Sequence, residues 1–223
     1  MLTSSFIDIK RISLSWSLYW ILAVAFLSLV LKPLGFDYNQ NFIVFSLLYL
    51  MFGLIGLHLF NLRTFIFERV KRLNFLLLFV IPTFFFGTAT LYFEKFYPLL
   101  PEQVEKIQEI GILFPLFNIE TFIAKLSDII FQQIMIFILV LGLERQGHSH
   151  KNIITSFTIT FLVLHLPLIV IFKTYGFVFI IPAAFAGTLF SYIILKFKQG
   201  PCISIIVHQG FYLILGVLMR FWV

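Results

Sequence analysis

Residues 124–143 read AKLSDIIFQQIMIFILVLGL, and Lys125 and Asp128 are the only charged side chains in this stretch. An α-helix rises about 1.5 Å per residue, so a helix of about 20 apolar residues crosses the ~30 Å hydrocarbon core of a bilayer. The stretch therefore predicts a transmembrane helix, with two adjacent glutamines, Gln132 and Gln133, near its middle.

The same length and apolar character recur along the chain. Membrane-spanning helices are predicted over 13–31, 42–61, 73–92, 124–143, 153–172, 176–196 and 201–221. Charged residues or turn formers bound these stretches, and the sequence has no internal repeat and no low-complexity linker. We therefore expect an all-α polytopic integral membrane helix bundle of about seven transmembrane helices. Residues 1–121 supply the N-terminal helices and an interfacial segment, and residues 122–223 supply a four-helix core within one integrated membrane domain.

The composition excludes a soluble globular domain. Hydrophobic residues make up 61% of the 223 residues, charged residues make up 12%, and the mean hydropathy is +1.03. A soluble domain is about 45–50% apolar and about 25% charged. The net charge of +6 is spread over the loops, as in many membrane proteins, so it does not indicate a nucleic-acid partner. The single cysteine, Cys202, excludes an intramolecular disulfide.

Residues 99–118 predict a different kind of helix. Val104 and Ile107 fall on one helical face, and Glu102 and Glu105 fall on the other. This pattern is typical of a short helix that lies in the membrane interface. An ordinary amphipathic connector is the alternative.

The distribution of positive charge predicts the orientation in the membrane. If the N-terminus is cytoplasmic, ten of the sixteen Lys and Arg residues fall in cytoplasmic segments and six fall outside. Cytoplasmic loops of membrane proteins carry the excess of Lys and Arg. We therefore expect a cytoplasmic N-terminus and an external C-terminus.

Two sequence features predict how helices pack. Ala183, Gly187 and Ser191 recur every four residues, a pattern that lets helix backbones approach closely. Pro167 has no backbone N–H to donate, so it leaves the carbonyl of Val163 without its helical partner and predicts a kink two residues after His165.

Polar side chains inside the predicted spans mark the candidate site, because a buried polar group is costly unless it is paired. The set includes Asp128, Gln132, Gln133, His165, His208 and Tyr212. The rise per residue places His165, His208 and Gln132 at overlapping depths. Two imidazoles at similar depth on separate helices suggest a metal site. The alternative is that each histidine hydrogen-bonds a neighbouring helix.

Two motifs in the C-terminal half resemble a known family. FLVLH (161–165) has the form F-x-x-x-H, and about twenty residues later FAGTLFSYIILKFKQGPCISIIVHQGFY begins, with His208 after an apolar run. This layout resembles the CPBP (CAAX-protease and bacteriocin-processing, or Abi) family of intramembrane metalloproteases. Its core is four consecutive helices bearing E-E-x-x-x-R, then F-x-x-x-H, then H-x-x-x-N. The resemblance covers residues 124–216.

The resemblance implies roles for individual residues. His165 and His208 match the two histidines that bind metal, for which zinc is the expected ion, or orient the reacting water. Tyr212 stands where the family prefers the asparagine that stabilises the oxyanion. Gln132 and Gln133 replace the glutamate pair. Phe137 stands in place of the arginine, and we do not count it among the candidate catalytic residues. A glutamine amide cannot take a proton at neutral pH, so the general base of the family mechanism is missing.

Asp128 offers a replacement for that base. It lies four residues before Gln132, on the same helical face. Our hypothesis is that its carboxylate completes a set with His165 and His208. The alternative is that Asp128 lies near the outer interface in contact with water, one turn from Lys125.

These residues leave three functions to compare. The first is a CPBP-like intramembrane metalloprotease of the bacterial inner membrane that cleaves a membrane-associated peptide or protein, such as a CAAX-type prenylated tail. The second is a non-catalytic descendant that binds a membrane partner or lipid at the same site, which the glutamines favour. The third is a bis-histidine haem protein with His165 and His208 as axial ligands, which a Soret absorption band would reveal.

Overall fold

The helices of the computed structural model follow the predicted spans. The structure describes residues 2–31, 33–36, 40–62, 64, 72–110 and 118–222, and these residues form helices and turns without a β-strand. In chain order the helices are α1 Leu2–Ala25 continued by a π-helical segment η1 Phe26–Leu31, α2 Phe42–Leu59, α4 Arg72–Phe96, α5 Pro101–Ile110, α6 Ile119–Arg145, α7 His150–His165, α8 Pro167–Phe172, a 3-10 turn η2 Lys173–Gly176, α9 Phe177–Lys196 and α10 Gly200–Trp222.

The lengths and hydropathies of these helices confirm an all-α polytopic membrane bundle. Within the described residues, six stretches are long and apolar enough to cross a membrane: Ile9–Leu31, Phe42–Leu59, Ile119–Arg145, His150–Val170, Phe177–Lys196 and Gly200–Leu218. The predicted span over 73–92 corresponds to α4, a helix of 25 residues.

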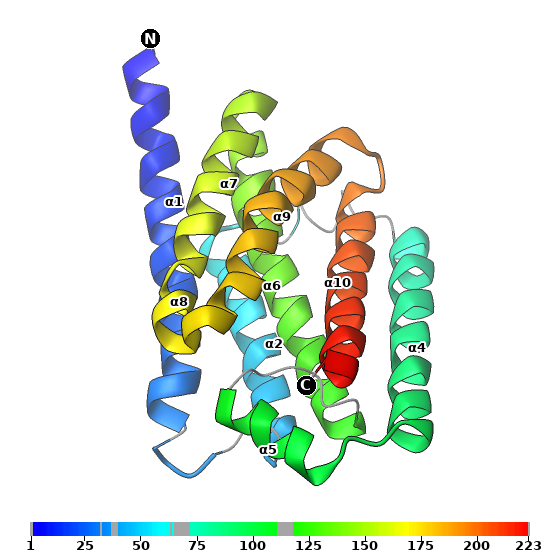
Figure 1. Ribbon diagram of the computed structural model, residues 1–223. Helices are drawn as coiled ribbons and strands as arrows, with labels where there is room; N and C mark the ends of the chain where they lie inside the picture. The colour runs from blue at the N-terminus through cyan, green and yellow to red at the C-terminus, as the bar shows by residue number, and fades with distance from the viewer. Residues whose placement is uncertain are drawn as a thin grey trace.

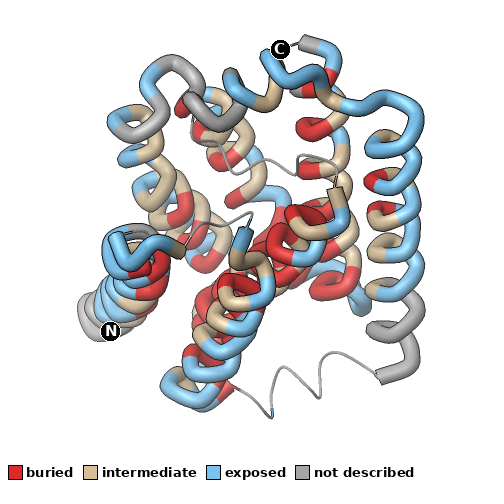
Figure 2. Tube along the Cα trace, turned by 90° about the horizontal axis from the view of Figure 1, so that it is seen from below, coloured by how far each residue is buried: buried red, intermediate tan, exposed pale blue. Residues whose placement is uncertain are grey.

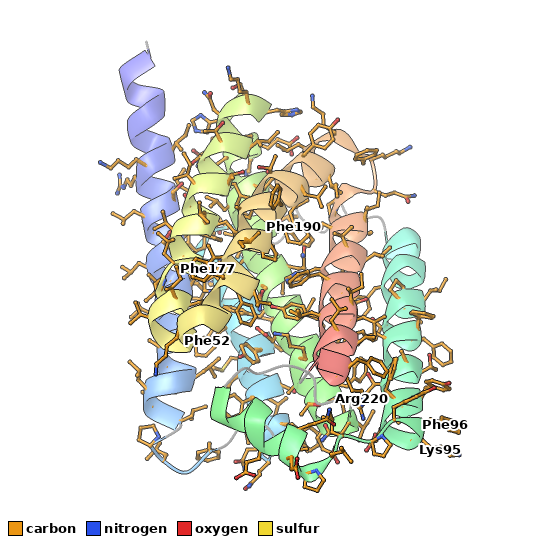
Figure 3. All side chains as sticks on the ribbon, viewed as in Figure 1. Phe52, Lys95, Phe96, Phe177, Phe190 and Arg220 are labelled. Carbon is orange, nitrogen blue, oxygen red and sulfur yellow. The ribbon has the colours of Figure 1, made fainter. Side chains whose placement is uncertain are left out.

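The long helices run alternately up and down, and the two chain ends lie toward opposite ends of the bundle (Figure 1). The short helix α5 lies across the lower end of the bundle (Figure 1). It covers the first part of the segment predicted to be interfacial, whereas residues 111–117 lie outside the described residues. Near α5, the Arg220 side chain ties the last turn of α10 to α4 by donating hydrogen bonds to the carbonyl oxygens of Tyr97 and Phe93 (Figure 3).

Helix α6 is the centre of the bundle. It packs against α1, α2, α4, α7, α9 and α10, and most of its side chains are buried (Figure 2). The indole of Trp16, on α1, is fully buried and donates a hydrogen bond of 2.7 Å to the Met135 carbonyl of α6. The predicted span 124–143 is therefore mostly buried by other helices, which places Lys125, Asp128 and Gln133 in the interior.

The small-residue pattern on α9 packs against α7. A Cβ atom added to Gly187 would lie 2.9 Å from the Cα of Thr158, which is closer than real Cβ contacts. Ala183 and Ser191 are also buried, and the Thr158 and Thr188 hydroxyls lie 3.1 Å apart across the interface. The close approach predicted from the sequence is confirmed.

The regular helix is interrupted next to Pro167, as the missing proline N–H predicts, and the kink itself stays a prediction. Helix α7 ends at His165, and α8 begins at Pro167. The Val163 carbonyl would normally accept from the amide of residue 167, which is a proline. It accepts instead from the Leu166 amide, at 3.3 Å. The break leaves His165 in the last turn of α7.

Candidate functional site

The candidate site lies between α6 and α10, which pack against each other in the interior of the bundle. Helix periodicity brings side chains four residues apart to one face, so Ser204, His208 and Tyr212 form a row along α10. We call the following side chains the polar cluster: Lys125, Asp128, Gln132 and Gln133 of α6 with Ser204, His208 and Tyr212 of α10.

One half of the polar cluster joins the two helices by hydrogen bonds. The Gln133 amide nitrogen Nε2 lies 2.8 Å from His208 Nδ1 and 3.4 Å from the Ser204 carbonyl oxygen. The Ser204 hydroxyl donates to Gln133 Oε1 at 3.1 Å. All three side chains are buried, with exposed fractions of 1% for Gln133, 4% for His208 and 0% for Ser204. Gln133 therefore satisfies its own amide and fixes the orientation of the His208 ring.

The other half of the polar cluster is an ion pair. Lys125 Nζ donates to Asp128 Oδ2 at 2.6 Å, and Gln132 Nε2 donates to Asp128 Oδ1 at 2.8 Å. Lys125 and Asp128 are 5% and 9% exposed. The ammonium also lies 3.8 Å from the centroid of the Tyr212 ring, a cation–π contact. Both oxygens of the carboxylate are thus engaged, and its charge is balanced.

Stacked rings connect the two halves. The His208 and Tyr212 ring centroids are 5.3 Å apart with the rings nearly parallel. The His208 ring also packs against the ring of Phe190 of α9, with ring centroids 5.2 Å apart. Aromatic side chains of α9 and α10 therefore pack against the imidazole of the polar cluster.

His165 lies at the edge of this arrangement. Its Nδ1 donates to the Phe161 carbonyl oxygen at 2.7 Å, and its ring packs on the Phe161 ring at 4.4 Å. The side chain is half-buried. The hydrogen-bond partner of His208 across the helices is thus Gln133, and His165 takes its hydrogen bond from its own helix.

Gln209, the residue after His208 on α10, makes a second interhelical contact. Gln209 Nε2 donates to the Thr83 hydroxyl of α4 at 3.1 Å, and Gln209 Oε1 is buried without a hydrogen-bond partner among the described residues. Thr83 follows Pro82, which lies inside α4. This contact joins α10 to α4 and lies outside the polar cluster.

The chemistry open to Asp128 follows from its partners. A general base needs a lone pair directed at the proton it removes. Asp128 is buried, as the replacement-base hypothesis requires. It is also paired with Lys125, the neighbour named in the alternative interpretation. Its assignment as a replacement base stays a prediction.

Zinc binding also stays a prediction. Over the part of the chain that the structure describes, no group of three or more His, Cys, Asp or Glu side chains is placed to hold a metal ion. A catalytic zinc usually has three protein ligands and one open position. His165 and His208 supply two imidazoles. At the position of the family's glutamate, the Gln133 amide contacts His208 Nδ1.

Two members of the polar cluster were not among the predicted site residues. Lys125 lies three residues before Asp128, a spacing that indicates an ion pair. Ser204 precedes His208 by one helical turn, a spacing that places both on one face. Hydropathy alone does not reveal which face of a helix is buried.

Comparisons with protein-family models, curated proteins and solved structures find no match for this chain. The CPBP resemblance therefore stays a prediction based on the motifs of residues 124–216.

Proposed function

We propose that this chain is a CPBP-like membrane protein that binds a membrane-associated peptide or protein at the polar cluster without hydrolysing it. The observation that carries the proposal is that the side chains at the position of a general base are already occupied by hydrogen bonds within the protein. Asp128 accepts from Lys125 and Gln132, and Gln133 is hydrogen-bonded to His208.

The two glutamines support binding over hydrolysis. An amide side chain offers a donor and an acceptor but does not take up a proton at neutral pH. Gln132 and Gln133 therefore keep the size and hydrogen-bonding capacity of the family's glutamates while losing their basicity.

The charge balance of the polar cluster supports a peptide over an anionic lipid. The positive charge of Lys125 is compensated by Asp128 at 2.6 Å, and the other side chains of the cluster are neutral amides, hydroxyls and an imidazole. A charged headgroup would gain little Coulomb energy from such a site and would lose its hydration. A peptide backbone is neutral and brings hydrogen-bonding groups that a buried polar site can pair.

The proposed setting is the bacterial inner membrane, with the N-terminus in the cytoplasm. The excess of Lys and Arg in the segments on the N-terminal side supports this orientation. The bacterial setting follows from the CPBP resemblance.

A binding measurement tests the proposal. The protein is reconstituted in lipid nanodiscs and titrated into a fluorescent farnesylated peptide with a CAAX-type C-terminus, and fluorescence anisotropy reports binding. We expect saturable binding that is weakened about 5- to 150-fold in His208→Phe, since an unpaired buried group costs about 1–3 kcal/mol. Phe185→Leu, on the exposed face of α9, is the control and should bind like the wild type.

Absence of saturable binding, or equal binding by His208→Phe, would count against the proposal. Gln132→Leu provides a second variant for the case in which His208→Phe does not fold, because Gln132 is only half-buried. Gel filtration of each variant checks that the bundle is intact.

A further inference from the structure

One boundary of the bundle carries a row of exposed cations. Lys10 lies at the start of the apolar span of α1, Lys151 at the start of the span of α7, and Lys196 at the end of the span of α9. Arg11 follows Lys10, and Lys198 lies in the turn between α9 and α10. We call these five residues the basic rim. Figure 1 shows that α1 begins, α7 begins and α9 ends on the same side of the bundle.

The helices that carry the basic rim are successive neighbours, since α1 packs against α7, α7 against α9, and α9 against α10. The five side chains make no hydrogen bond or ion pair with the described residues. At the same end, Arg145 donates to the Asn61 carbonyl oxygen at 2.7 Å, and Glu144 Oε1 lies 3.8 Å from His150 Nε2. The described side chains therefore leave the positive charge of the basic rim uncompensated.

The opposite boundary of the bundle, where α5 lies, has the reverse charge (Figure 1). Glu94 of α4 and both Glu102 and Glu105 of α5 are exposed there. The Arg220 guanidinium is bonded to backbone carbonyls, and the Lys95 ammonium lies 5.4 Å from the centroid of an aromatic ring. Exposed positive charge without a partner is therefore concentrated at the boundary of the basic rim.

An apolar stripe on α9 continues from Lys196 toward the middle of the bundle. Phe185, Leu189 and Tyr192 lie on the same helical face as Lys196, because three or four residues separate each from the next. Their side chains are 72%, 45% and 47% exposed. From Phe185 to Lys196 the helix rises about 16 Å, which is about half of the ~30 Å hydrocarbon core. The stripe therefore has the length of the acyl chains of one leaflet, with Lys196 at the level of the headgroups.

The turn between α9 and α10 adds an exposed aromatic ring between two lysines. Phe197 is 49% exposed and lies between Lys196 and Lys198 in the sequence. Its ring meets the ring of Tyr192 edge-on, with centroids 6.3 Å apart. Amphipathic rings such as that of tyrosine are enriched where the hydrocarbon core meets the headgroups. The turn therefore combines positive charge with the aromatic surface typical of this level of a membrane.

We propose that the basic rim binds the phosphate groups of anionic phospholipids, such as phosphatidylglycerol, while their acyl chains pack on the apolar stripe below Lys196. A lysine ammonium donates charge-assisted hydrogen bonds to phosphate oxygens, and a negatively charged leaflet attracts each nearby Lys or Arg. A soluble anion would use the cations alone, whereas a lipid also covers the exposed stripe. The basic rim lies at the boundary of the bundle and the polar cluster in its interior, so this inference does not depend on the proposed function.

Electron spin resonance of spin-labelled lipids tests the basic rim. The protein is reconstituted in phosphatidylcholine bilayers that contain a trace of spin-labelled phosphatidylglycerol or spin-labelled phosphatidylcholine. The immobilised fraction of each probe gives its relative affinity for the protein surface. We expect phosphatidylglycerol to be favoured about fivefold, the factor that one cation near an anionic lipid supplies. At ~1 M salt, where the Debye length is about 3 Å, the preference should fall below about twofold.

Matched variants connect the preference to the basic rim. Lys196→Gln/Lys198→Gln removes two charges, and the preference for phosphatidylglycerol should fall to about one- to twofold. Lys196→Arg/Lys198→Arg keeps the charges and should keep the preference. Lys173→Gln removes an exposed cation between α8 and α9, at the opposite boundary, and should behave like the wild type. Lys10→Gln/Arg11→Gln is an independent pair on α1, for the case in which the α9–α10 turn does not tolerate change.

Three results would overturn the inference. The first is equal immobilisation of the two probes by the wild type. The second is a preference for phosphatidylglycerol that survives in both glutamine pairs, or that Lys173→Gln abolishes. The third is loss of the preference on addition of glycerophosphoglycerol, the water-soluble headgroup without acyl chains, which would identify a soluble anion as the ligand. Gel filtration of each variant checks that the bundle is intact.

Discussion

At the scale of single residues, Lys125 and Asp128 show how the interior of the bundle tolerates charge. The pair is buried, bonded at 2.6 Å, and supported by Gln132 and by the ring of Tyr212. Removing one member of a buried pair leaves an uncompensated charge, whereas removing both leaves none.

Lys125 and Asp128 should therefore be strongly coupled in their effect on stability. Lys125→Met and Asp128→Asn should each lower the free energy of unfolding by about 3–5 kcal/mol, and the double variant should lose less than the sum. Unfolding in mixed detergent micelles, followed by circular dichroism, measures each value. Lys151→Met, at an exposed position of α7, is the control. Strict additivity of the two changes would contradict the ion pair.

Gln209 permits a second test at the residue scale. Its Nε2 is paired with Thr83, while its Oε1 is buried without a partner among the described residues. Thr83→Val leaves Gln209 Nε2 without its acceptor, whereas Gln209→Leu removes both polar atoms of the Gln209 side chain. Thr83→Val should therefore lower the unfolding temperature more. The reverse order in a thermal-unfolding assay would indicate that Gln209 Oε1 has a polar partner.

At the scale of elements, the α7–α9 contact depends on the absence of a side chain at Gly187. An added Cβ would lie 2.9 Å from the Thr158 backbone, whereas a Cβ added at Gly210 of α10 would meet no atom within 4 Å. Gly187→Ala should therefore destabilise the protein by about 1–3 kcal/mol, the usual cost of overpacking, and Gly210→Ala should not. Equal thermal unfolding of the two variants would contradict the close approach of these helices.

The elements also show how far the sequence supported prediction. The span over 124–143, the small-residue pattern on α9 and the break at Pro167 follow from length, periodicity and the missing proline N–H, which are local properties. The contact between Gln133 and His208 joins residues 75 positions apart and depends on which faces of α6 and α10 meet. The motif order predicted that these residues share a site, but only the packing shows that Gln132 turns to Asp128 instead.

At the scale of the whole molecule, the alternating helices place the α6–α7 turn and the α4–α5 connection at opposite ends of the bundle (Figure 1). In a Cys202→Ser background, Gln146→Cys should therefore react with a membrane-impermeant maleimide only in inside-out vesicles. Leu100→Cys should react only in intact spheroplasts. Both positions are exposed, so burial does not limit labelling. The opposite labelling pattern would reverse the orientation proposed from the positive charges.

The central claim is that the whole protein binds a membrane-associated peptide and leaves it intact. The most direct measurement is mass spectrometry of the farnesylated CAAX-type peptide after incubation with the wild-type protein in nanodiscs with added zinc. The account predicts that the peptide is recovered uncleaved under conditions in which anisotropy shows it bound. A cleavage product that accumulates with time in the wild type, and is absent with His208→Phe, would contradict the account and restore the metalloprotease interpretation.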